Sequence, residues 1–315
     1  MRSSDVRFVR RSSVFAFVVA VMMVIAVMEV GLRRVENSYT KKRRMLESRA
    51  SEIDVIVTGP SGALFGIDPS VIGPHAVNLG DVSQSLYYDT ELVKRYLPRL
   101  PKLRTVVFTV GLFAFEYSLA DTPEYWRQFW YQRFWDIPPE RDEHSLDLRR
   151  FSTIALYPPK IRLKALIHAF HLDVAPEIDA NGWRHLGDND LGSVTEANAL
   201  ERAQYHASIM HPTYIASNER ALAETIDRLH ARGVATLLVV LPVHPLYVAH
   251  FSSAALLRLH AVLGRLASEH GAAVRDYATD SSFSADQFID TDHLNARGAQ
   301  RMSAIVARDV IEVAP

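Results

Sequence analysis

The most constraining feature of this sequence is the alternation of short apolar runs with amphipathic helical patterns. The apolar runs are rich in valine, leucine and isoleucine, and the first three of them end at a glycine. Runs of this kind are typical of strands that are buried on both faces of a sheet. We therefore predict an α/β fold with a parallel sheet, whose strands lie at residues 54–58, 76–79, 105–110, 234–241 and 272–277.

Helices are expected between these strands. Residues 89–97 and 253–271 have apolar residues at helical spacing, Asn218 is placed to cap a helix that runs to Ala231, and a final helix is expected to start near Asn295. Between about residues 120 and 213 neither pattern holds, and aromatic residues and prolines are frequent. We expect this stretch to be an insertion between units of the core.

The amino-terminal segment is suited to a membrane. Four arginines precede an apolar run over residues 14–28, which extends to Leu32 if Glu29 can lie at the membrane interface. A membrane span needs about 20 apolar residues, and the extended run reaches that length. A signal-peptide core would also fit, but no pair of small residues at a cleavage site follows the run. We predict an uncleaved anchor over residues 1–32.

Residues 33–50 are charged and poorly apolar, which predicts a juxtamembrane stalk before a globular domain at residues 51–315. Six basic residues follow the apolar run, against four before it. Taken literally, the positive-inside rule would then place the globular domain in the cytoplasm. The same basic cluster is also suited to contact anionic lipid head groups.

Composition excludes several classes of site. The chain has no cysteine, which excludes disulfides, thiolate zinc sites and cysteine nucleophiles. Lys and Arg total 35 against 36 Asp and Glu, so the net charge gives no general reason to expect a nucleic-acid partner. The chain also lacks the glycine-rich motifs of nucleotide-binding loops, and we predict no cofactor and no metal.

Ser61 is the first candidate for chemistry. It follows the first predicted strand and lies between Gly59 and Gly62. The carboxyl ends of parallel strands open into a crevice where ligands bind, and the glycines permit a tight turn there. A serine that simply caps a helix would give the same pattern, so this motif alone does not assign a nucleophile.

Asp290 and His293 are the second candidate. They lie three residues apart, immediately before the predicted last helix. At that spacing on a turn, the carboxylate can hold one imidazole nitrogen while the other faces outward as a general base. The alternative is that His293 and the neighbouring Asp292 are ordinary polar residues of a helix cap.

Together these motifs resemble the SGNH (GDSL-like) hydrolase superfamily in order and in approximate separation. The first block of that superfamily is similar to Gly59-Pro60-Ser61, the second to Asn78-Leu79-Gly80, and the last to the segment from Asp290 to His293. The resemblance implies a flavodoxin-like parallel sheet flanked by helices. It also implies a Ser61 nucleophile, a His293 base oriented by Asp290, and an oxyanion hole made by the amides of Ser61 and Gly80.

The third block departs from the superfamily. Where an asparagine usually donates to the oxyanion, this chain has Phe113. Loss of one oxyanion donor typically costs about 10²- to 10³-fold in rate. Gln84 or Ser83, after Gly80, and His244, at the end of the fourth strand, are candidates for the missing donor or for substrate contacts.

The sequence around these motifs resembles a branch of the superfamily with a single membrane span, which works beside membrane-bound O-acyltransferases. The segments that carry this resemblance are ALFGIDP after the serine and DHLNARGA near the end. The alginate-acetylation and teichoic-acid D-alanylation proteins belong to that branch. The resemblance implies a body in the periplasm or otherwise outside the cytoplasmic (inner) membrane, an envelope or secreted polysaccharide as substrate, and a membrane-bound O-acyltransferase or polysaccharide synthase as partner. The expected function is that of a serine esterase or O-acetyltransferase. The alternative is a catalytically silent protein that binds polysaccharide or scaffolds a synthesis complex.

Overall fold

The computed structural model describes residues 3–158, 162, 178–186 and 194–314 of the chain. These residues fall into two compact units. The smaller unit draws on residues 1–37 and 143–175, and the larger on residues 38–142 and 176–315.

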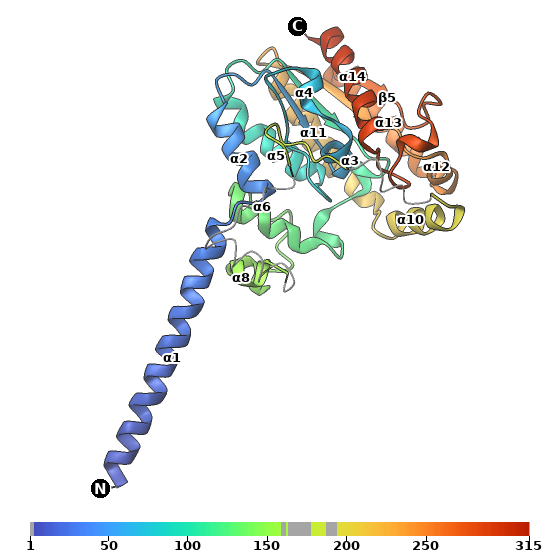
Figure 1. Ribbon diagram of the computed structural model, residues 1–315. Helices are drawn as coiled ribbons and strands as arrows, with labels where there is room; N and C mark the ends of the chain where they lie inside the picture. The colour runs from blue at the N-terminus through green and yellow to red at the C-terminus, as the bar shows by residue number, and fades with distance from the viewer. Residues whose placement is uncertain (1–2, 159–161, 163–177, 187–193, 315) are drawn as a thin grey trace. The chain divides into compact units, whose positions relative to one another are not determined.

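The larger unit is built on a sheet that lies among its helices (Figure 1). The sheet has five parallel strands in the order β2-β1-β3-β4-β5. The predicted α/β class and its flavodoxin-like sheet are therefore confirmed. The strands lie within one or two residues of their expected positions: β1 (Val55–Thr58), β2 (Ala76–Asn78), β3 (Thr105–Thr109), β4 (Ala235–Val240) and β5 (Ala273–Asp276).

Helices of the larger unit cover both faces of this sheet. They are α2 (Ser38–Ser48), α3 (Ser61–Gly66), α4 (Pro69–Ile72), α5 (Leu86–Tyr96), α6 (Gln128–Trp135), α10 (Glu196–Ser208), α11 (Ile215–His230), α12 (Pro245–His250), α13 (Ser253–His270) and α14 (Ala296–Val313). Short 3-10 turns lie at Leu97–Arg99, Ala114–Glu116, Leu119–Asp121, Tyr125–Arg127, Pro212–Tyr214 and Ala285–Gln287. Helix α14 packs against α3 and α4, whereas α11 packs against α5 and α13.

The two faces of the sheet follow from the alternation of side chains along each strand. One set of alternate residues, with Val57, Val107 and Val239, packs into a core with Met302 and Val306 of α14. The other set is equally buried: Ile56, Val106, Phe108 and Leu238 are all fully inaccessible. A sheet that is apolar on both faces needs helices on both, which is why its strands read as continuous apolar runs.

Two helix starts test the capping predictions. Asn295 caps α14, because its side chain accepts a hydrogen bond from the Gly298 amide at 3.0 Å, as predicted. The expected cap at Asn218 is wrong, since α11 begins at Ile215. Asn218 instead is buried and donates to the carbonyls of Phe115 and Tyr117 at 3.0 Å, so its amide serves a distant loop rather than its own helix.

Part of the stretch predicted as a stalk forms α2, which packs in the larger unit with Tyr39, Met45 and Leu46 buried. Its basic residues have protein partners. The Lys41 ammonium donates to the Ile178 carbonyl, and Arg43 pairs with Asp136 at 2.8 Å. Lys42 is buried, donates to the Gly80 carbonyl and lies 3.5 Å from the Asp81 carboxylate. Burial lowers the pKa of Lys42, and the Asp81 carboxylate opposes that shift.

The smaller unit holds the amino-terminal helix α1 (Ser3–Arg34) together with α7 (Leu148–Phe151) and α8 (Thr153–Leu156). Residues 13–34 of α1 are long and apolar enough to cross a membrane. This agrees with the predicted apolar segment, and the helix continues through Glu29 without interruption.

The turn after β1 leaves no room for a side chain at Gly59. Its φ is +144°, and a Cβ atom there would lie 2.0 Å from Thr109 Oγ1 and 2.7 Å from the Thr109 carbonyl oxygen. We expect Gly59→Ala to lower the free energy of unfolding by about 3 kcal/mol, through backbone strain and overpacking. Urea unfolding of the detergent-solubilised protein measures this change.

Gly264 provides the matched control, because it lies exposed within α13 and a Cβ atom added there would meet open space. Gly264→Ala should be neutral or stabilise by up to about 1 kcal/mol. Equal effects of the two substitutions would contradict the tight turn described for Gly59.

Candidate active site

The candidate site lies where the strand order reverses. The chain passes from β1 to β2 on one side and then returns to β3 on the other, so the carboxyl ends of β1 and β3 flank a crevice. A cavity of about 420 Å³ opens there. Its wall includes Ser61 and His293, and much of the rest is apolar: Phe65, Val82, Leu86, Val110, Leu112, Phe113, Ile209, Val240, Leu241 and Val243.

Ser61 is the first residue of α3, directly after the turn at Gly59 and Pro60. Helix α3 is held in place by the buried side chain of Asn78, at the end of β2. The Asn78 amide nitrogen donates to the carbonyls of Ala63 and Ile67, at 2.7 and 2.8 Å. The serine is therefore fixed at the mouth of the crevice by the strand that precedes it and by the neighbouring strand.

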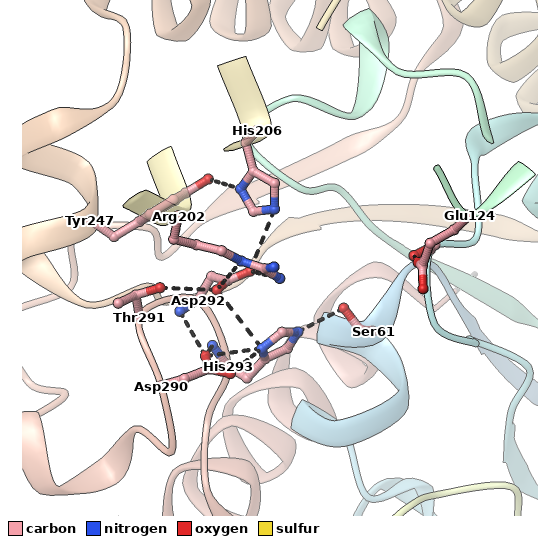
Figure 2. Close-up of polar contacts among 10 residues, drawn as sticks. Ser61, Glu124, Arg202, His206, Tyr247, Asp290, Thr291, Asp292 and His293 are labelled. Atoms are coloured by element: carbon pink, nitrogen blue, oxygen red, sulfur yellow. Dashed lines mark hydrogen bonds and ion pairs between the residues drawn. The ribbon is translucent and has the colours of Figure 1, made fainter. Parts of the chain in front are cut away.

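A continuous chain of hydrogen bonds joins Ser61, His293 and Asp290 (Figure 2). The Ser61 hydroxyl lies 2.7 Å from Nε2 of His293. The other ring nitrogen, Nδ1, lies 2.9 and 3.0 Å from the two carboxylate oxygens of Asp290. Asp290 also accepts from the backbone amides of Asp292 and His293, so the turn that the spacing predicts is closed by the carboxylate itself.

A second carboxylate lies beside the same ring. Asp292 Oδ1 is 3.9 Å from His293 Nδ1, and its two oxygens receive two hydrogen bonds at 2.9 Å from the guanidinium of Arg202. Figure 2 shows Arg202 reaching Asp292 from α10. No local sequence pattern points to Arg202, because it lies 90 residues away from its partner in the sequence.

These charges set the protonation of the site. Burial alone would lower the pKa of His293, but Asp292 and Asp290 raise it above its ordinary value, while Arg202 opposes them. For Asp292, burial would raise the pKa, and His293 and Arg202 instead hold it at about 2. The imidazole is thus made a stronger base, and the Asp292 carboxylate beside it remains ionised at neutral pH.

A second histidine forms one wall of the cavity. His206 Nδ1 lies 2.5 Å from the Tyr247 hydroxyl, and its ring packs on Phe113 with the centroids 4.3 Å apart. Burial lowers the pKa of His206 to about 4, so its ring is neutral at physiological pH. Phe113, which replaces the expected asparagine, therefore contributes an apolar surface shared with His206 and Tyr117.

The two amides predicted to form the oxyanion hole differ in their surroundings. The Ser61 amide is at the first position of α3, where backbone N–H groups have no partner within the helix. The Gly80 amide donates to the Asn78 side-chain oxygen at 2.9 Å. An oxyanion that used Gly80 would have to compete with this buried bond.

The other predicted contacts also have partners. Gln84 lines the cavity, but its amide nitrogen donates to Thr58 and Asp89, and its oxygen accepts from Tyr131. Burial raises the pKa of Asp89 to about 7.

Ser83 and His244 were the remaining candidates. Ser83 lies on the cavity wall in a left-handed conformation, with φ at 57°, and its hydroxyl donates to Glu124. His244 is outside the lining residues of the cavity and caps α12, with its ring against Phe288. Of the residues predicted for the site, Ser61, Asp290 and His293 are brought together, and Gln84 and Ser83 face the same cavity.

A metal ion could in principle use three of these groups. Asp290, Asp292 and His293 each offer a ligand atom, and these atoms lie within 4.8 Å of one another. All three are already engaged: Asp292 pairs with Arg202, and the two ring nitrogens of His293 bond to Asp290 and Ser61. A guanidinium on two carboxylate oxygens competes directly with a cation, so the donor set fits a proton relay better than a metal site.

No protein-family model matches this chain, and no curated protein matches it in sequence. Solved structures offer a similar arrangement of elements. A GDSL-like lipase from Bacteroides thetaiotaomicron is 9% identical, with a TM-score of 0.41, and the match covers 87% of this chain and 98% of that one. A predicted acylhydrolase from Bacteroides fragilis is 11% identical, with a TM-score of 0.41 and coverage of 86% and 95%. The geometry of Ser61, His293 and Asp290, rather than these likenesses, carries the functional assignment.

The opposing charges beside His293 predict opposite shifts in its pKa. Asp292→Asn removes an anion and should lower the pKa, whereas Arg202→Gln removes a cation and should raise it. Because only the neutral ring can accept the Ser61 proton, the acid limb of Ser61 reactivity should move to lower pH in the first variant and to higher pH in the second. The rate of fluorophosphonate labelling as a function of pH measures both. Shifts of the same sign would contradict this electrostatic account.

Proposed function

We propose that this protein is a serine esterase or O-acyltransferase that works through an acyl-enzyme at Ser61. The observation that carries the proposal is the chain of short contacts from the Ser61 hydroxyl through His293 to Asp290. A nucleophile, a base within hydrogen-bond reach and a group that orients the base are the three parts that nucleophilic catalysis requires.

Each group has a role in the proposed reaction. With its Nδ1 hydrogen directed to Asp290, His293 takes the Ser61 proton at Nε2 while the serine oxygen attacks the acyl carbonyl. The tetrahedral intermediate collapses when His293 returns that proton to the leaving alcohol, which leaves the acyl group on Ser61. Water or a sugar hydroxyl then attacks the acyl carbon and gives its proton to His293. His293 passes this proton to the Ser61 oxygen as the bond between Ser61 and the acyl group breaks, which restores free serine and a neutral imidazole. Attack by water gives an esterase, and attack by a sugar gives a transferase.

The cavity supports an acyl group larger than the acetyl group that the resemblance implies. A water-sized atom takes up about 30 Å³ in a liquid, so the three heavy atoms of an acetyl group need roughly 100 Å³. The cavity holds about 420 Å³ and is lined by apolar residues next to Ser61, among them Leu112, Phe113, Val240 and Leu241. The proposal therefore extends to longer apolar acyl chains.

The proposed setting is the cytoplasmic membrane, with α1 as a single-pass anchor and the body on the periplasmic or outer side. The acceptor or donor is an envelope or secreted polysaccharide, and a membrane-bound O-acyltransferase or polysaccharide synthase is the expected partner. The excess of basic residues after the span would oppose this topology. Lys41, Lys42 and Arg43 are engaged inside the folded unit, however, which supports giving less weight to that count.

A second candidate function is a catalytically silent fold that binds polysaccharide or scaffolds a synthesis complex. Two observations favour it: Phe113 stands where an oxyanion donor is expected, and the Gly80 amide is bonded to Asn78. Chemical reactivity of Ser61 distinguishes the two functions, because a scaffold has no need of an activated serine.

Ser61→Ala should abolish fluorophosphonate labelling and lower ester hydrolysis by about 10⁴-fold or more, since it removes the nucleophile. Ser268→Ala, on the exposed face of α13, is the matched control and should leave both unchanged. Labelling of the purified protein followed by mass spectrometry of the modified peptide measures the first effect. An unlabelled wild-type protein with no esterase activity would favour the silent scaffold.

The cavity also predicts a dependence on acyl length. From acetate to hexanoate, kcat/KM for p-nitrophenyl esters should rise by up to about fourfold for each methylene buried. Ala114→Phe should remove this gain by filling the cavity, whereas Ala261→Phe, exposed on α13, should not. A wild-type protein with a higher kcat/KM for the acetate ester than for the hexanoate ester would restrict the site to acetyl groups.

A further inference from the structure

A carboxylate near the carboxyl end of the apolar helix is bound by the chain segment that follows α7. Glu29 of α1 accepts hydrogen bonds from the Ser152 hydroxyl at 3.1 Å and from the amides of Thr153 and Ile154 at 2.8 and 3.1 Å. Arg33 also pairs with Glu29 at 3.0 Å. All these residues belong to the smaller unit, so α8 is fixed directly to α1.

The position of Glu29 along α1 sets the depth of that junction. A helix rises 1.5 Å per residue, so Glu29 lies about 8 Å before the helix end at Arg34 and about 22 Å beyond Val14. In a hydrocarbon core about 30 Å thick that begins at Val14, Glu29 lies about 8 Å inside the far boundary, and the helix end at Arg34 lies at that boundary. A carboxylate is costly at this depth unless its oxygens have partners, and here α8 and Arg33 supply them.

The segment just before this junction exposes three large apolar side chains. Leu146, Leu148 and Phe151 have 90%, 73% and 61% of their surface accessible, and the arginine at position 150 lies over the Phe151 ring. We call Leu146, Leu148 and Phe151 the α7 patch. The Ser152 amide donates to the Leu148 carbonyl at 2.9 Å, so the patch is held within one helical turn of the junction with Glu29.

We propose that the α7 patch is a second membrane contact, which lies in the interface between acyl chains and head groups beside the exit of α1. This inference rests on the proposed membrane anchor and is independent of the catalytic site. Three exposed apolar side chains next to a transmembrane helix, with arginines between them, match the composition of interfacial segments. The occupant of the patch is lipid, because the junction with Glu29 holds the patch beside the part of α1 that passes from the acyl chains to the head groups.

The absence of cysteine makes the test clean, since each introduced cysteine is the only labelling site. Leu148→Cys, Leu257→Cys and Phe17→Cys would each be labelled with the fluorophore NBD in the full chain reconstituted in phosphatidylcholine bilayers. Leu257, on α13, is the matched control, because it is a leucine with nearly the same exposure, 71%. Phe17 reports on the span itself. Nitroxide lipids and aqueous iodide serve as quenchers.

The label at Leu148 should be quenched at least twofold more by a nitroxide near the head groups than the label at Leu257, and less by iodide. The label at Phe17 should be quenched by nitroxides on the acyl chains and shielded from iodide. Combined with Leu148→Cys, the substitution Glu29→Ala should reduce quenching of the label by the nitroxide near the head groups. Combined with Phe17→Cys, it should leave the quenching of the label unchanged.

Other outcomes separate the possible failures. If the label at Phe17 is not quenched by lipid, the membrane anchor itself is wrong. If Phe17 is quenched but Leu148 behaves like Leu257, the anchor stands and the patch does not contact lipid. A label at Leu148 that is shielded from iodide but not quenched by any nitroxide lipid would show that protein covers the patch, and would overturn the proposal.

Discussion

The buried side chain of Asn78 is the contact on which the arrangement around the nucleophile depends. Its three hydrogen bonds join the end of β2 to the carbonyls of Ala63 and Ile67 and to the Gly80 amide. The first two fix α3, and hence Ser61, against the neighbouring strand. The third fixes the loop that follows β2. A single polar residue at the edge of the sheet thus holds the helix that begins at Ser61 and also engages the Gly80 amide.

The cavity combines apolar walls with buried polar groups that are already paired. Gln84 is held by Thr58, Asp89 and Tyr131, and His206 is held by Tyr247. Groups engaged in this way stiffen the wall rather than offer bonds to a ligand. The reacting end of a substrate would therefore meet Ser61 and His293, while its acyl portion would meet surfaces such as Phe113.

Local signals explain what could be predicted from the sequence. Strands buried on both faces produce continuous apolar runs, and the Asp290 to His293 spacing lies within one turn, so both can be read from neighbouring residues. Arg202 and the buried Lys42 could not be predicted in this way. Each of them depends on contacts between segments that only folding brings together. Asn218 failed as a predicted cap for the same reason, because its partners lie about 100 residues earlier.

The pairing of Arg202 with Asp292 allows the pKa of His293 to change while Ser61, His293 and Asp290 stay the same. Ser61 begins α3, and Asp290 and His293 lie just before α14, whereas Arg202 comes from α10. In the proposed mechanism, the working pH of the base is therefore adjustable from a segment that contributes no atom to bond making. A related chain with a different residue in α10 could keep the same nucleophile and base and operate in a more acidic or a more alkaline compartment.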